Sequence, residues 1–437
     1  MTTPTSKPLS WAETLPRAEL RALQSERLRA VVRHAYDHVP FYRRRMDEAG
    51  VRPDDIRDIA DLAKLPFTVK KDFRDQYPFG MLGTPLRDIV RIHASSGTTG
   101  KPTVAASTQA DLDVWAECAA RALERAGSTP ESIVQVSYGY GLFTGGLGMH
   151  YAAERLGAAV VPASAGNTEK QVMLMKDFGV TTLCCTPSYA LQIAEVGAAM
   201  GVDMHSLKLR AGHFGAEPWT EAMRKHIEEV LPLKAYDIYG LSEVAGPGVA
   251  GECTQQSGLH FCEDHFYPEI IDPETGAPLP DGEKGELVVT CLSKYGQPLL
   301  RYRTRDITCI LPDACPCGRT TRRIARLMGR TDDMLIIRGV NVFPSQIEDV
   351  LVRVKGVLPQ YLITVDRQGN LDTMEIQIEI GNDAFTDKIK TLEALRADLQ
   401  HRLKTVLNVG AKVKLCEPGS IERTLGKAVR VRDLRKI

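Results

Sequence analysis

One segment near residue 100 has the composition of an anion-binding loop. It reads Ser95-Ser96-Gly97-Thr98-Thr99-Gly100-Lys101-Pro102-Thr103 and follows a strand-like run from Ile89 to His93. Glycines let the backbone curl so that N–H groups and hydroxyls face one anion, and Lys101 adds a positive charge. The segment predicts a polyphosphate loop. It is not a Walker A loop, because the spacing Gly-x4-Gly-Lys-Ser/Thr is absent and a proline follows the lysine. Considered alone, a solvated turn is an equal alternative.

The cysteines form a second group with chemical potential, since six of the ten fall between Cys253 and Cys317. The spacings Cys253-x6-His260 and Cys315-x-Cys317 place metal-binding side chains close together on loops, and three thiolates with one imidazole form a usual structural zinc site. We expect these four residues to hold zinc, with Cys262 facing away or substituting for one of them. Scattered buried thiols are the alternative. The cysteines in strand-like runs, which we expect in the core, are Cys184, Cys185, Cys291 and Cys309.

Composition excludes several classes of protein. The 437 residues include 55 Lys plus Arg and 55 Asp plus Glu, so a net charge of zero offers no basic surface for nucleic acid. No uncharged apolar run approaches the roughly 18 residues of a membrane span, and the segment from Met1 to Arg17 lacks the apolar stretch of a secretory signal. Ten cysteines are too few for a disulfide scaffold in a chain of this length. We therefore expect a cytoplasmic protein with neither nucleic acid nor membrane as a partner.

The large N-terminal part of the chain has the pattern of an α/β domain. From Leu20 to Ala49 apolar residues recur with helical spacing, which predicts an amphipathic lead-in within about residues 1–90. Farther on, short β-branched runs alternate with helical segments. This alternation is typical of βαβ units and a mostly parallel sheet. The paired segments are Ser132–Val136 with Met149–Leu156, Ala158–Pro162 with Thr168–Phe178, and Thr181–Cys185 with Ser188–Met200.

The pattern changes twice toward the C-terminus. Near Glu283 short strands separated by turns predict an antiparallel appendage, so the large domain should contain mixed sheets. Beyond Gly329 the remaining residues predict a small α+β domain with its own core. We therefore expect an N-terminal core of residues 1–329 and a C-terminal domain of residues 330–437. The elements expected in the small domain are strands at Met334–Ile337, Leu358–Val365 and Met374–Ile380 and helices at Pro344–Val354 and Asp387–Leu407.

Taken together, the motifs resemble those of the adenylate-forming enzymes, the superfamily of acyl-CoA synthetases, adenylation domains and luciferases. The resemblance spans nearly the whole chain, and it is strongest toward the phenylacetate-CoA ligases. The joint occurrence of the motifs is specific, although each one alone is weak. Besides the loop at Ser95, they are Gly215-Ala216-Glu217-Pro218, Tyr239 to Gly248 (YGLSEVAGPG), Glu263 to Asp272 (EDHFYPEIID), Tyr302 to Asp306 (YRTRD), Gly329 to Asp333 (GRTDD), Arg338 to Glu348 (RGVNVFPSQIE) and Gly426-Lys427.

This resemblance implies a two-step reaction. The acid is joined to the α-phosphate of ATP with loss of pyrophosphate, and the thiol of CoA then displaces AMP. The loop would cradle the β- and γ-phosphates, Glu243 would help to hold Mg²⁺, Tyr239 would pack against adenine, Asp306 would accept the ribose hydroxyls and Arg330 would lie near the ribose and phosphate. The implied nucleotide-binding residues are Ser95, Ser96, Gly97, Thr98, Thr99, Gly100, Lys101, Gly215, Ala216, Glu217, Tyr239, Gly240, Asp306 and Arg330.

The resemblance also implies a catalytic lysine and a hinge. Lys427, preceded by Gly426, would bridge the acyl carboxylate and the α-phosphate. Its neighbours make a solvated face the alternative, since residues 411–437 hold eight Lys and Arg against three Asp and Glu. The lysine must leave before CoA approaches, and Asp332 is the implied hinge at the domain boundary. The small domain is thus expected to be mobile.

The acyl pocket is implied by the segment from Ser137 to Gly146, whose aromatic and small residues leave a slot for a ring. A glycine-rich turn with core aromatics is nearly as good an interpretation. The segment Val104 to Thr108 departs from the pattern expected in phenylacetate ligases, which bears on the substrate rather than on the reaction. Some of these ligases resemble this chain in carrying zinc at the corresponding loops. The pocket residues implied are Tyr138, Tyr140, Phe143 and Gly145.

The sequence therefore predicts a ligase that activates an aryl or arylacetic acid, phenylacetate first among them, with ATP, Mg²⁺ and CoA. One alternative is transfer to a carrier-protein thiol or another nucleophile, and a second is a non-catalytic nucleotide- or acyl-binding regulator. A zinc-stabilised interaction protein would explain the cysteines alone. The identity of the acid stays open, as does the pathway, for which aromatic acid catabolism is inferred only from the family. A homodimer is expected, with Leu20 to Ala49 as a candidate interface.

Overall fold

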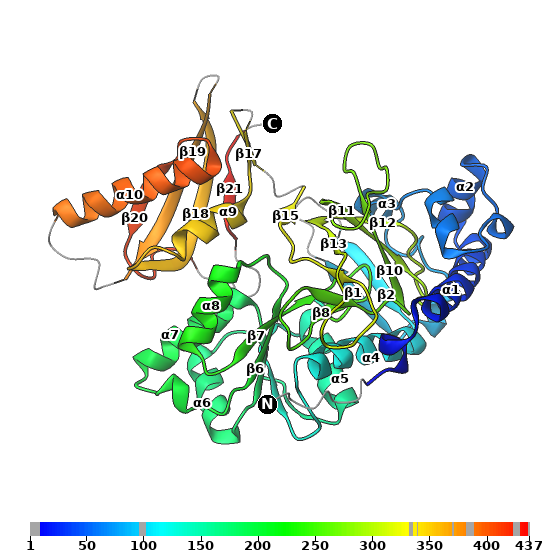
Figure 1. Cartoon of the computed structure of the whole chain (residues 1–437), viewed down its shortest axis with the longest axis horizontal. Helices are drawn as coiled ribbons and strands as arrows, with labels where there is room; N and C mark the ends of the chain where they lie inside the picture. Colours follow the sequence, from blue (N-terminus) through cyan, green and yellow to red (C-terminus); the bar gives the residue numbers. More distant parts are fainter. Residues whose placement is uncertain are drawn as a thin grey trace. The chain divides into compact units, whose positions relative to one another are not determined.

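The chain forms two compact units, each with its own core. The computed structural model describes residues 9–95, 102–331, 335–338, 340–368, 371–381, 389–422 and 429–435. The first unit, unit 1, comprises Met1–Cys185, Leu207–Ala216 and Leu233–Leu327. The second, unit 2, comprises Thr186–Ser206, Glu217–Pro232 and Met328–Ile437. Figure 1 labels the elements of both units along the chain.

Unit 1 is built on a nine-stranded sheet in the order β13-β14-β9-β8-β7-β6-β5-β3-β4. The run β4-β3-β5-β6-β7 is parallel, which confirms the expected βαβ pattern, and the other strands pair antiparallel. The parallel strands are β3 (Ile133–Val136), β4 (Ala159–Val161), β5 (Thr182–Cys185), β6 (Ala211–Gly215) and β7 (Lys234–Tyr239). The antiparallel strands are β8 (Ala250–Glu252), β9 (Leu259–Phe261), β13 (Ile310–Leu311) and β14 (Arg323–Ile324).

Two smaller pieces of sheet complete unit 1. Strands β10 (Phe266–Ile271), β11 (Gly285–Cys291) and β12 (Tyr302–Thr308) pair antiparallel, as the turn-rich sequence around Glu283 predicts. Strands β1 (Arg91–Ser95) and β2 (Thr103–Ser107) form an antiparallel hairpin whose connection is the glycine-rich loop. The large unit is therefore α/β with mixed sheets.

Helices α4 (Gln109–Arg125) and α5 (Gly145–Leu156) cover one face of the parallel strands. Thr108 caps α4 by accepting from the backbone N–H of Asp111, and the Asp111 carboxylate accepts from the backbone of Thr108 in return. The same carboxylate accepts from the N–H groups of Tyr295 and Gly296, so it ties this helix start to the loop after β11. The remaining helices of unit 1 are η1 (Trp11–Thr14), α1 (Arg17–His38), α2 (Pro40–Glu48), η2 (Pro53–Asp55), η3 (Ile59–Lys64), α3 (Lys70–Asp75), η4 (Leu86–Asp88) and α6 (Thr168–Phe178).

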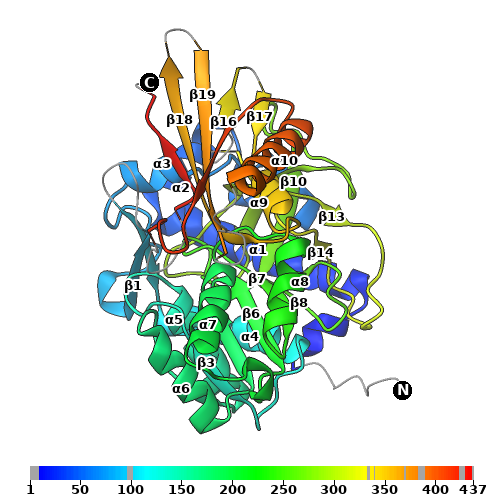
Figure 2. The same ribbon diagram turned by 90° about the vertical axis from the view of Figure 1, so that its left-hand side faces the viewer.

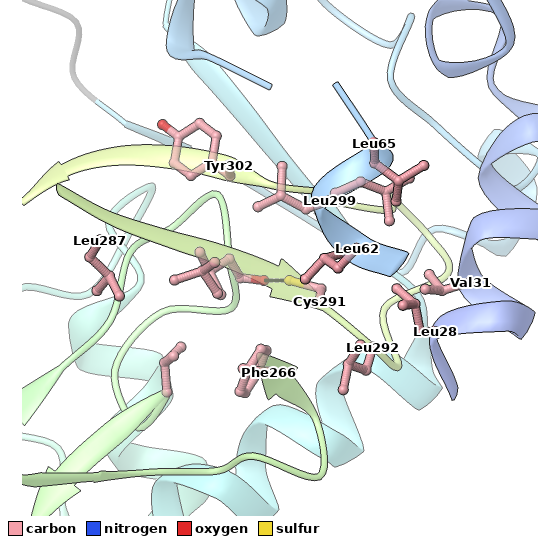
Figure 3. Close-up of a cluster of buried hydrophobic side chains, with 14 of the residues drawn as sticks. Leu28, Val31, Leu62, Leu65, Phe266, Leu287, Cys291, Leu292, Leu299 and Tyr302 are labelled. Carbon is pink, nitrogen blue, oxygen red and sulfur yellow. Dashed lines mark hydrogen bonds between the residues drawn. The ribbon is translucent and has the colours of Figure 1, made fainter. Parts of the chain in front are cut away.

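The predicted amphipathic lead-in forms two helices, because Pro40 begins α2 directly after the α1 helix ends. The apolar side of α1 belongs to the largest core cluster of unit 1. Figure 3 shows Leu28 and Val31 of α1 together with Leu62 of η3. Leu292 and Leu299, from the connection between β11 and β12, belong to the same cluster. This side of the lead-in packs within its own chain. The expected homodimer stays a prediction.

Unit 2 contains a small α+β domain. Strands β18 (Val357–Gln368) and β19 (Leu371–Ile380) form a long antiparallel hairpin, flanked in parallel by β21 (Val431–Asp433) and β20 (Lys412–Cys416). Helices α9 (Pro344–Leu351) and α10 (Ile389–Leu407) lie on one face of this sheet (Figures 1 and 2). The other elements of unit 2 are α7 (Pro187–Ala199), η5 (Met204–Ser206), α8 (Glu221–Val230), β15 (Gly329–Arg330), β16 (Leu335–Ile337) and β17 (Val340–Val342). The mobility of this domain and a functional boundary between residues 329 and 330 stay predictions.

Candidate active site and metal centre

Two of the predicted nucleotide-binding residues meet in unit 1. Tyr239 is the last residue of β7, and Asp306 lies in β12, so each belongs to a different sheet. The Tyr239 hydroxyl donates to a carboxylate oxygen of Asp306 at 2.7 Å, and both side chains are buried. A tyrosine ring and a carboxylate held this way present a flat apolar face beside a hydrogen-bond acceptor. These are the two features needed to bind a purine and a ribose.

The backbone beside Tyr239 is shaped by residues that tolerate no ordinary side chain. Gly215 ends β6 opposite Ile238 of β7, and a Cβ at that glycine would collide with the Ile238 carbonyl. Ala216 follows with a φ of 70°, the left-handed region. A Cβ on Gly240 would likewise collide with the carbonyl of Gly246. The carboxyl ends of β6 and β7 therefore form one tight turn region, which is where ligands bind in parallel α/β sheets.

Glu217 follows this turn but belongs to unit 2. There its carboxylate accepts from the backbone N–H of Ser188, near the start of α7, at 2.8 Å. Arg330, also in unit 2, forms part of β15. Their positions toward Tyr239 and Asp306 stay predictions.

Glu243 lies in the loop after β7 and is 5% exposed. Its carboxylate is 3.8 Å from the ammonium of Lys70, which begins α3. Its carbonyl accepts from the ammonium of Lys294 at 2.8 Å. Lys294 is itself buried, and this burial lowers its pKa. The carboxylate of Glu243 supplies the oxygen ligands that a hard cation requires. The ammonium groups of Lys70 and Lys294 lie close by.

Sequence reasoning missed both lysines. Lys294 also lines a small cavity with Asp111, Trp115, Phe266 and the two residues after Glu243, Val244 and Ala245. Its sequence signal is weak, because Lys294 lies in a stretch between β11 and β12 that also contains Ser293, Gln297 and Arg301. Lys70 has no sequence signal, because a lysine followed by Lys71 and Asp72 has the composition of an ordinary surface segment. Lys294 thus fixes the backbone of the loop that carries Glu243.

The phosphate-loop prediction lies largely outside the described residues. Ser95 pairs with Thr103 across the β1–β2 hairpin, so the two ends of the loop are joined. The hydroxyls of both residues are buried and make no hydrogen bond within the described part of the chain. The loop residues Ser96, Gly97, Thr98, Thr99, Gly100 and Lys101 lie outside the described residues. The same holds for the hinge candidate Asp332 and the catalytic candidate Lys427.

The predicted acyl-pocket residues lie in the connection from β3 to α5. The Tyr138 hydroxyl donates to the carbonyl of His213 in β6 at 3.3 Å, and the ring belongs to the cluster formed by α4, α5 and the sheet. Tyr140 packs against the same cluster, and its hydroxyl lies 3.2 Å from Nδ1 of His150. Phe143 is 37% exposed, and its ring occupies the space that a Cβ on Gly145 would need. The pocket role of these residues stays a prediction.

The four predicted metal ligands come together in unit 1. One ligand atom from each of Cys253, His260, Cys315 and Cys317 lies within 4.8 Å of the other three. The Sγ atoms of Cys253 and Cys315 are 3.7 Å apart, and Sγ of Cys317 is 3.4 Å from Nε2 of His260. A tetrahedral zinc with Zn–S bonds of about 2.3 Å would separate two sulfurs by about 3.8 Å. The spacing therefore fits four ligands around one small ion.

The protonation chemistry of Cys317 and His260 also suits a metal, whereas a hydrogen bond with Cys317 raises the pKa of Cys253. Hydrogen bonds from Cys253 and then from His260 lower the pKa of the Cys317 thiol, and burial lowers the pKa of His260. Thiolate and neutral imidazole are the forms that bind metal. On its other side His260 Nδ1 lies 3.1 Å from the Thr321 hydroxyl, which orients the ring. Cys262 lies outside this group, where its thiol accepts from Arg125 at 3.3 Å.

A buried ion-pair network supports the metal cluster, and sequence reasoning did not foresee it. Glu13 of η1 accepts from Arg125 of α4 at 2.6 Å and from Arg319 at 3.0 Å. Arg125 also donates to the carbonyl of His260 at 2.9 Å. The N-terminal segment is thereby joined to the loop that holds Cys317. The thiols predicted in the core, Cys184, Cys185, Cys291 and Cys309, are all buried.

Comparison with known proteins gives matches along almost the entire chain. Residues 18–291 match the AMP-binding enzyme family, and residues 339–435 match the AMP-binding enzyme C-terminal domain. A phenylacetate-coenzyme A ligase of Aromatoleum evansii is 52% identical over 99% of this chain and 98% of that protein. The enzyme of the same name from Escherichia coli K12 is 51% identical over 99% of both chains.

Solved structures of 2-hydroxyisobutyryl-CoA ligase share the fold. Its complex with 2-HIB-AMP in the postadenylation state has a TM-score of 0.92 and 32% identity, and the match covers 99% of this chain and 94% of that one. The complex of that ligase with 2-HIB-AMP and CoA in the thioesterification state has a TM-score of 0.73 and 33% identity, covering 97% and 92%. Within the described residues, no helix combines the length and the apolar character needed to cross a membrane.

Proposed function

Because the chain belongs to the AMP-binding enzyme family and, within it, to the phenylacetate-coenzyme A ligases, we propose that it converts phenylacetate to its coenzyme A thioester with ATP, releasing AMP and pyrophosphate. It is an AMP-forming acid-thiol ligase. The observation that carries this function is an identity of 51 to 52% with four phenylacetate-coenzyme A ligases over at least 97% of this chain. The hydrogen bond between Tyr239 and Asp306 supports it, since it joins two residues suited to a nucleoside.

The proposed chemistry divides the work between a few side chains. A carboxylate is a poor acyl donor, so its oxygen attacks the α-phosphorus of ATP, and pyrophosphate leaves with the bond electrons. The loop from Ser95 to Lys101 would hold the β- and γ-phosphates, and Asp306 would accept from the ribose hydroxyls. Mg²⁺ would neutralise phosphate charge when it is bound, and Glu243 is the residue proposed to hold it. Gly215 to Glu217, Gly240 and Arg330 complete the proposed nucleotide site.

The second step needs a different arrangement of the same enzyme. The thiol of CoA attacks the acyl carbon of the adenylate, and AMP leaves. Lys427 would serve only the first step and would move away about a hinge at Asp332. Two observations support a boundary between residues 329 and 330. The last segment of unit 2 begins at Met328, and the match to the C-terminal family begins at residue 339.

The reaction itself is tested by AMP release from ATP with and without CoA. With phenylacetate and CoA we expect AMP formation at rates on the order of 1 to 100 per second, the ordinary range for enzymes. Without CoA, AMP should not be released, and pyrophosphate release should stop after about one per active site, because the adenylate keeps its AMP moiety and stays bound. The same assay with benzoates and short fatty acids measures selectivity.

Other outcomes of this assay would redirect the proposal. Acid-dependent pyrophosphate exchange without any CoA-dependent AMP formation would favour a carrier-protein thiol or another nucleophile as the acceptor. No turnover with any acid, together with ATP binding seen as a melting shift, would favour a non-catalytic regulator.

Zinc is proposed at Cys253, His260, Cys315 and Cys317 because their spacing suits a closed tetrahedral site. Four protein ligands leave no position for water, so its role would be structural. Metal analysis of the purified protein is expected to give about one zinc per chain. Cys317→Ser should lose most of the zinc and lower Tm by on the order of 10 °C, because a structural metal stabilises the fold that binds it.

A cysteine outside the cluster provides the matched control for the zinc prediction. Cys416 of β20 lies in unit 2, and Cys416→Ser is expected to keep the zinc and the wild-type Tm. If the wild-type protein were fully active without zinc and had the same Tm with and without it, the four residues would be an ordinary buried thiol cluster.

A further inference from the structure

One buried histidine in unit 1 has an unexplained polar atom. His213 is the middle residue of β6 and is 1% exposed. Its Nε2 atom is buried and makes no hydrogen bond within the described part of the chain. Buried polar atoms in native proteins nearly always have partners, so an orphaned one points to a ligand or to an ordered water. Nothing in the nucleotide chemistry described above uses this imidazole.

The register of the sheet places the His213 side chain beside the proposed acyl pocket. His213 pairs with Cys184 of β5 and with Tyr236 of β7, and paired residues of neighbouring strands share a face. Cys184 belongs to the cluster that α4 and α5 cover, which also contains Tyr138 and contacts Tyr140. Tyr140 packs against the same cluster that contains Cys184. The imidazole is thus one strand away from a thiol that lies next to the predicted pocket.

The distance along β6 matches the length of an arylacetic acid. The nucleotide end of the site lies at Gly215 and Ala216, and the acid must bring its carboxylate to the α-phosphate at that end. His213 is two residues earlier on the strand, about 6.6 Å at 3.3 Å per residue. In 4-hydroxyphenylacetic acid the carboxyl carbon and the para oxygen are separated by roughly 6.5 Å, from standard bond lengths. If the ring points away from the phosphate along β6, its far edge reaches the level of His213 on that strand.

The state of the imidazole restricts what it can recognise. Burial lowers the pKa of His213 to about 3, so the ring is neutral at assay pH. A neutral imidazole has one N–H donor and one acceptor, and it offers no charge for an anion. A phenolic hydroxyl is a small, neutral ring substituent that both donates and accepts. It would satisfy the orphaned nitrogen without bringing charge into the core.

We propose that His213 is a specificity-determining residue whose Nε2 hydrogen-bonds a hydroxyl on the far edge of the substrate ring, so that hydroxylated arylacetic acids are preferred to phenylacetate itself. This inference rests on the proposed ligase activity and narrows its substrate class. A site built to hydrogen-bond a hydroxyl discriminates strongly against the analogue that lacks it, because the buried partner is then left unpaired.

The test compares specificity constants for CoA-dependent AMP formation with the full-length protein. The acids are phenylacetate, 3-hydroxyphenylacetate and 4-hydroxyphenylacetate. For the wild type we expect kcat/KM for one hydroxylated acid to exceed that for phenylacetate by about tenfold or more. In His213→Leu this ratio should fall by about tenfold or more, and in His213→Gln, which keeps a hydrogen-bonding group, it should recover in part. His205→Leu, at an exposed histidine of η5, is the matched control and should keep the wild-type ratio.

The outcomes of this assay test the role of His213 separately from the proposed ligase activity. Turnover of phenylacetate with equal or lower kcat/KM for both hydroxylated acids would overturn the role of His213 and leave the ligase activity intact. The same conclusion would follow if the ratio were unchanged in His213→Leu, since His213 would then be a core residue packed on Tyr236. Absence of CoA-dependent AMP with all three acids would overturn the proposed function and the inference with it. The wild-type ratio stands as a test even if the leucine variant fails to fold.

Discussion

Lys427→Ala is expected to slow formation of the acyl-adenylate by about 10² to 10³-fold, the usual loss when one preorganised donor is removed from a developing charge. The reacting carboxylate and the α-phosphate are both anionic, so the first step brings like charges together, and an ammonium between them would neutralise both. Thioester formation from a supplied acyl-adenylate should change only a few-fold, because the acyl group is then already activated as a mixed anhydride and Lys427 is proposed to have moved away in this step. Single-turnover measurement of each half-reaction separates the two effects.

The matched control for this prediction is another lysine near the C-terminus. Lys414 in β20 is exposed, and Lys414→Ala should leave both half-reactions at wild-type rates. Equal losses in the two half-reactions of Lys427→Ala would contradict a lysine that serves one step only. Such a result would also remove the main reason for a hinge at Asp332.

Much of the fold follows from local sequence. Hydrophobic runs of strand length alternate with helical segments, and the chain forms β3, β5, α5 and α6 within a few residues of the predicted positions. The prediction of one lead-in from Leu20 to Ala49 missed the break at Pro40, although its cause is local, since proline removes the N–H that a continuous helix needs. These features depend on neighbours in the sequence, which is why the sequence alone suffices for them.

The contacts that hold the site together depend on residues far apart in the chain. Glu13 and Arg319 are separated by 306 residues, yet they share one buried ion pair beside the metal cluster. Lys294 reaches the carbonyl of Glu243 because two sheets of unit 1 meet there. A glutamate in a polar N-terminal segment and a lysine after a strand are ordinary surface residues by composition. Their roles appear only when the tertiary structure removes them from water.

The metal site depends partly on local sequence and partly on contacts between distant residues. The pairs Cys253 with His260 and Cys315 with Cys317 are local, and their spacing predicted a soft-ligand site. The meeting of the two pairs depends on β9 and β14, which pair through His260 and Arg323. The same packing settles where Cys262 lies, because Arg125 holds its thiol away from the cluster. Local spacing thus names the ligands, and sheet pairing brings them together.

Asp306→Ala is expected to raise KM for ATP by about 100-fold or more. A carboxylate that accepts from two ribose hydroxyls makes two charge-assisted hydrogen bonds, each contributing about 1.5 to 3 kcal/mol. The loss of both corresponds to at least about 3 kcal/mol of ATP binding, which is more than two factors of ten. The change also removes the acceptor for the Tyr239 hydroxyl, which is buried, so some loss of stability should accompany it. Initial rates of AMP formation at varied ATP, with acid and CoA saturating, measure KM, and Tm measures stability.

Tyr239→Phe separates these two effects. It breaks the same 2.7 Å hydrogen bond but keeps the carboxylate of Asp306 and the aromatic ring proposed to contact adenine. Its stability loss should be about 1 kcal/mol, the usual net value of one hydrogen bond, while KM for ATP should rise less than about tenfold. If both variants raised KM equally, the carboxylate would matter only as a partner of Tyr239, and the ribose would have to be held elsewhere. A large effect of Asp306→Ala beside a small one of Tyr239→Phe would instead show that the carboxylate itself receives the nucleotide, with Tyr239 holding it in place.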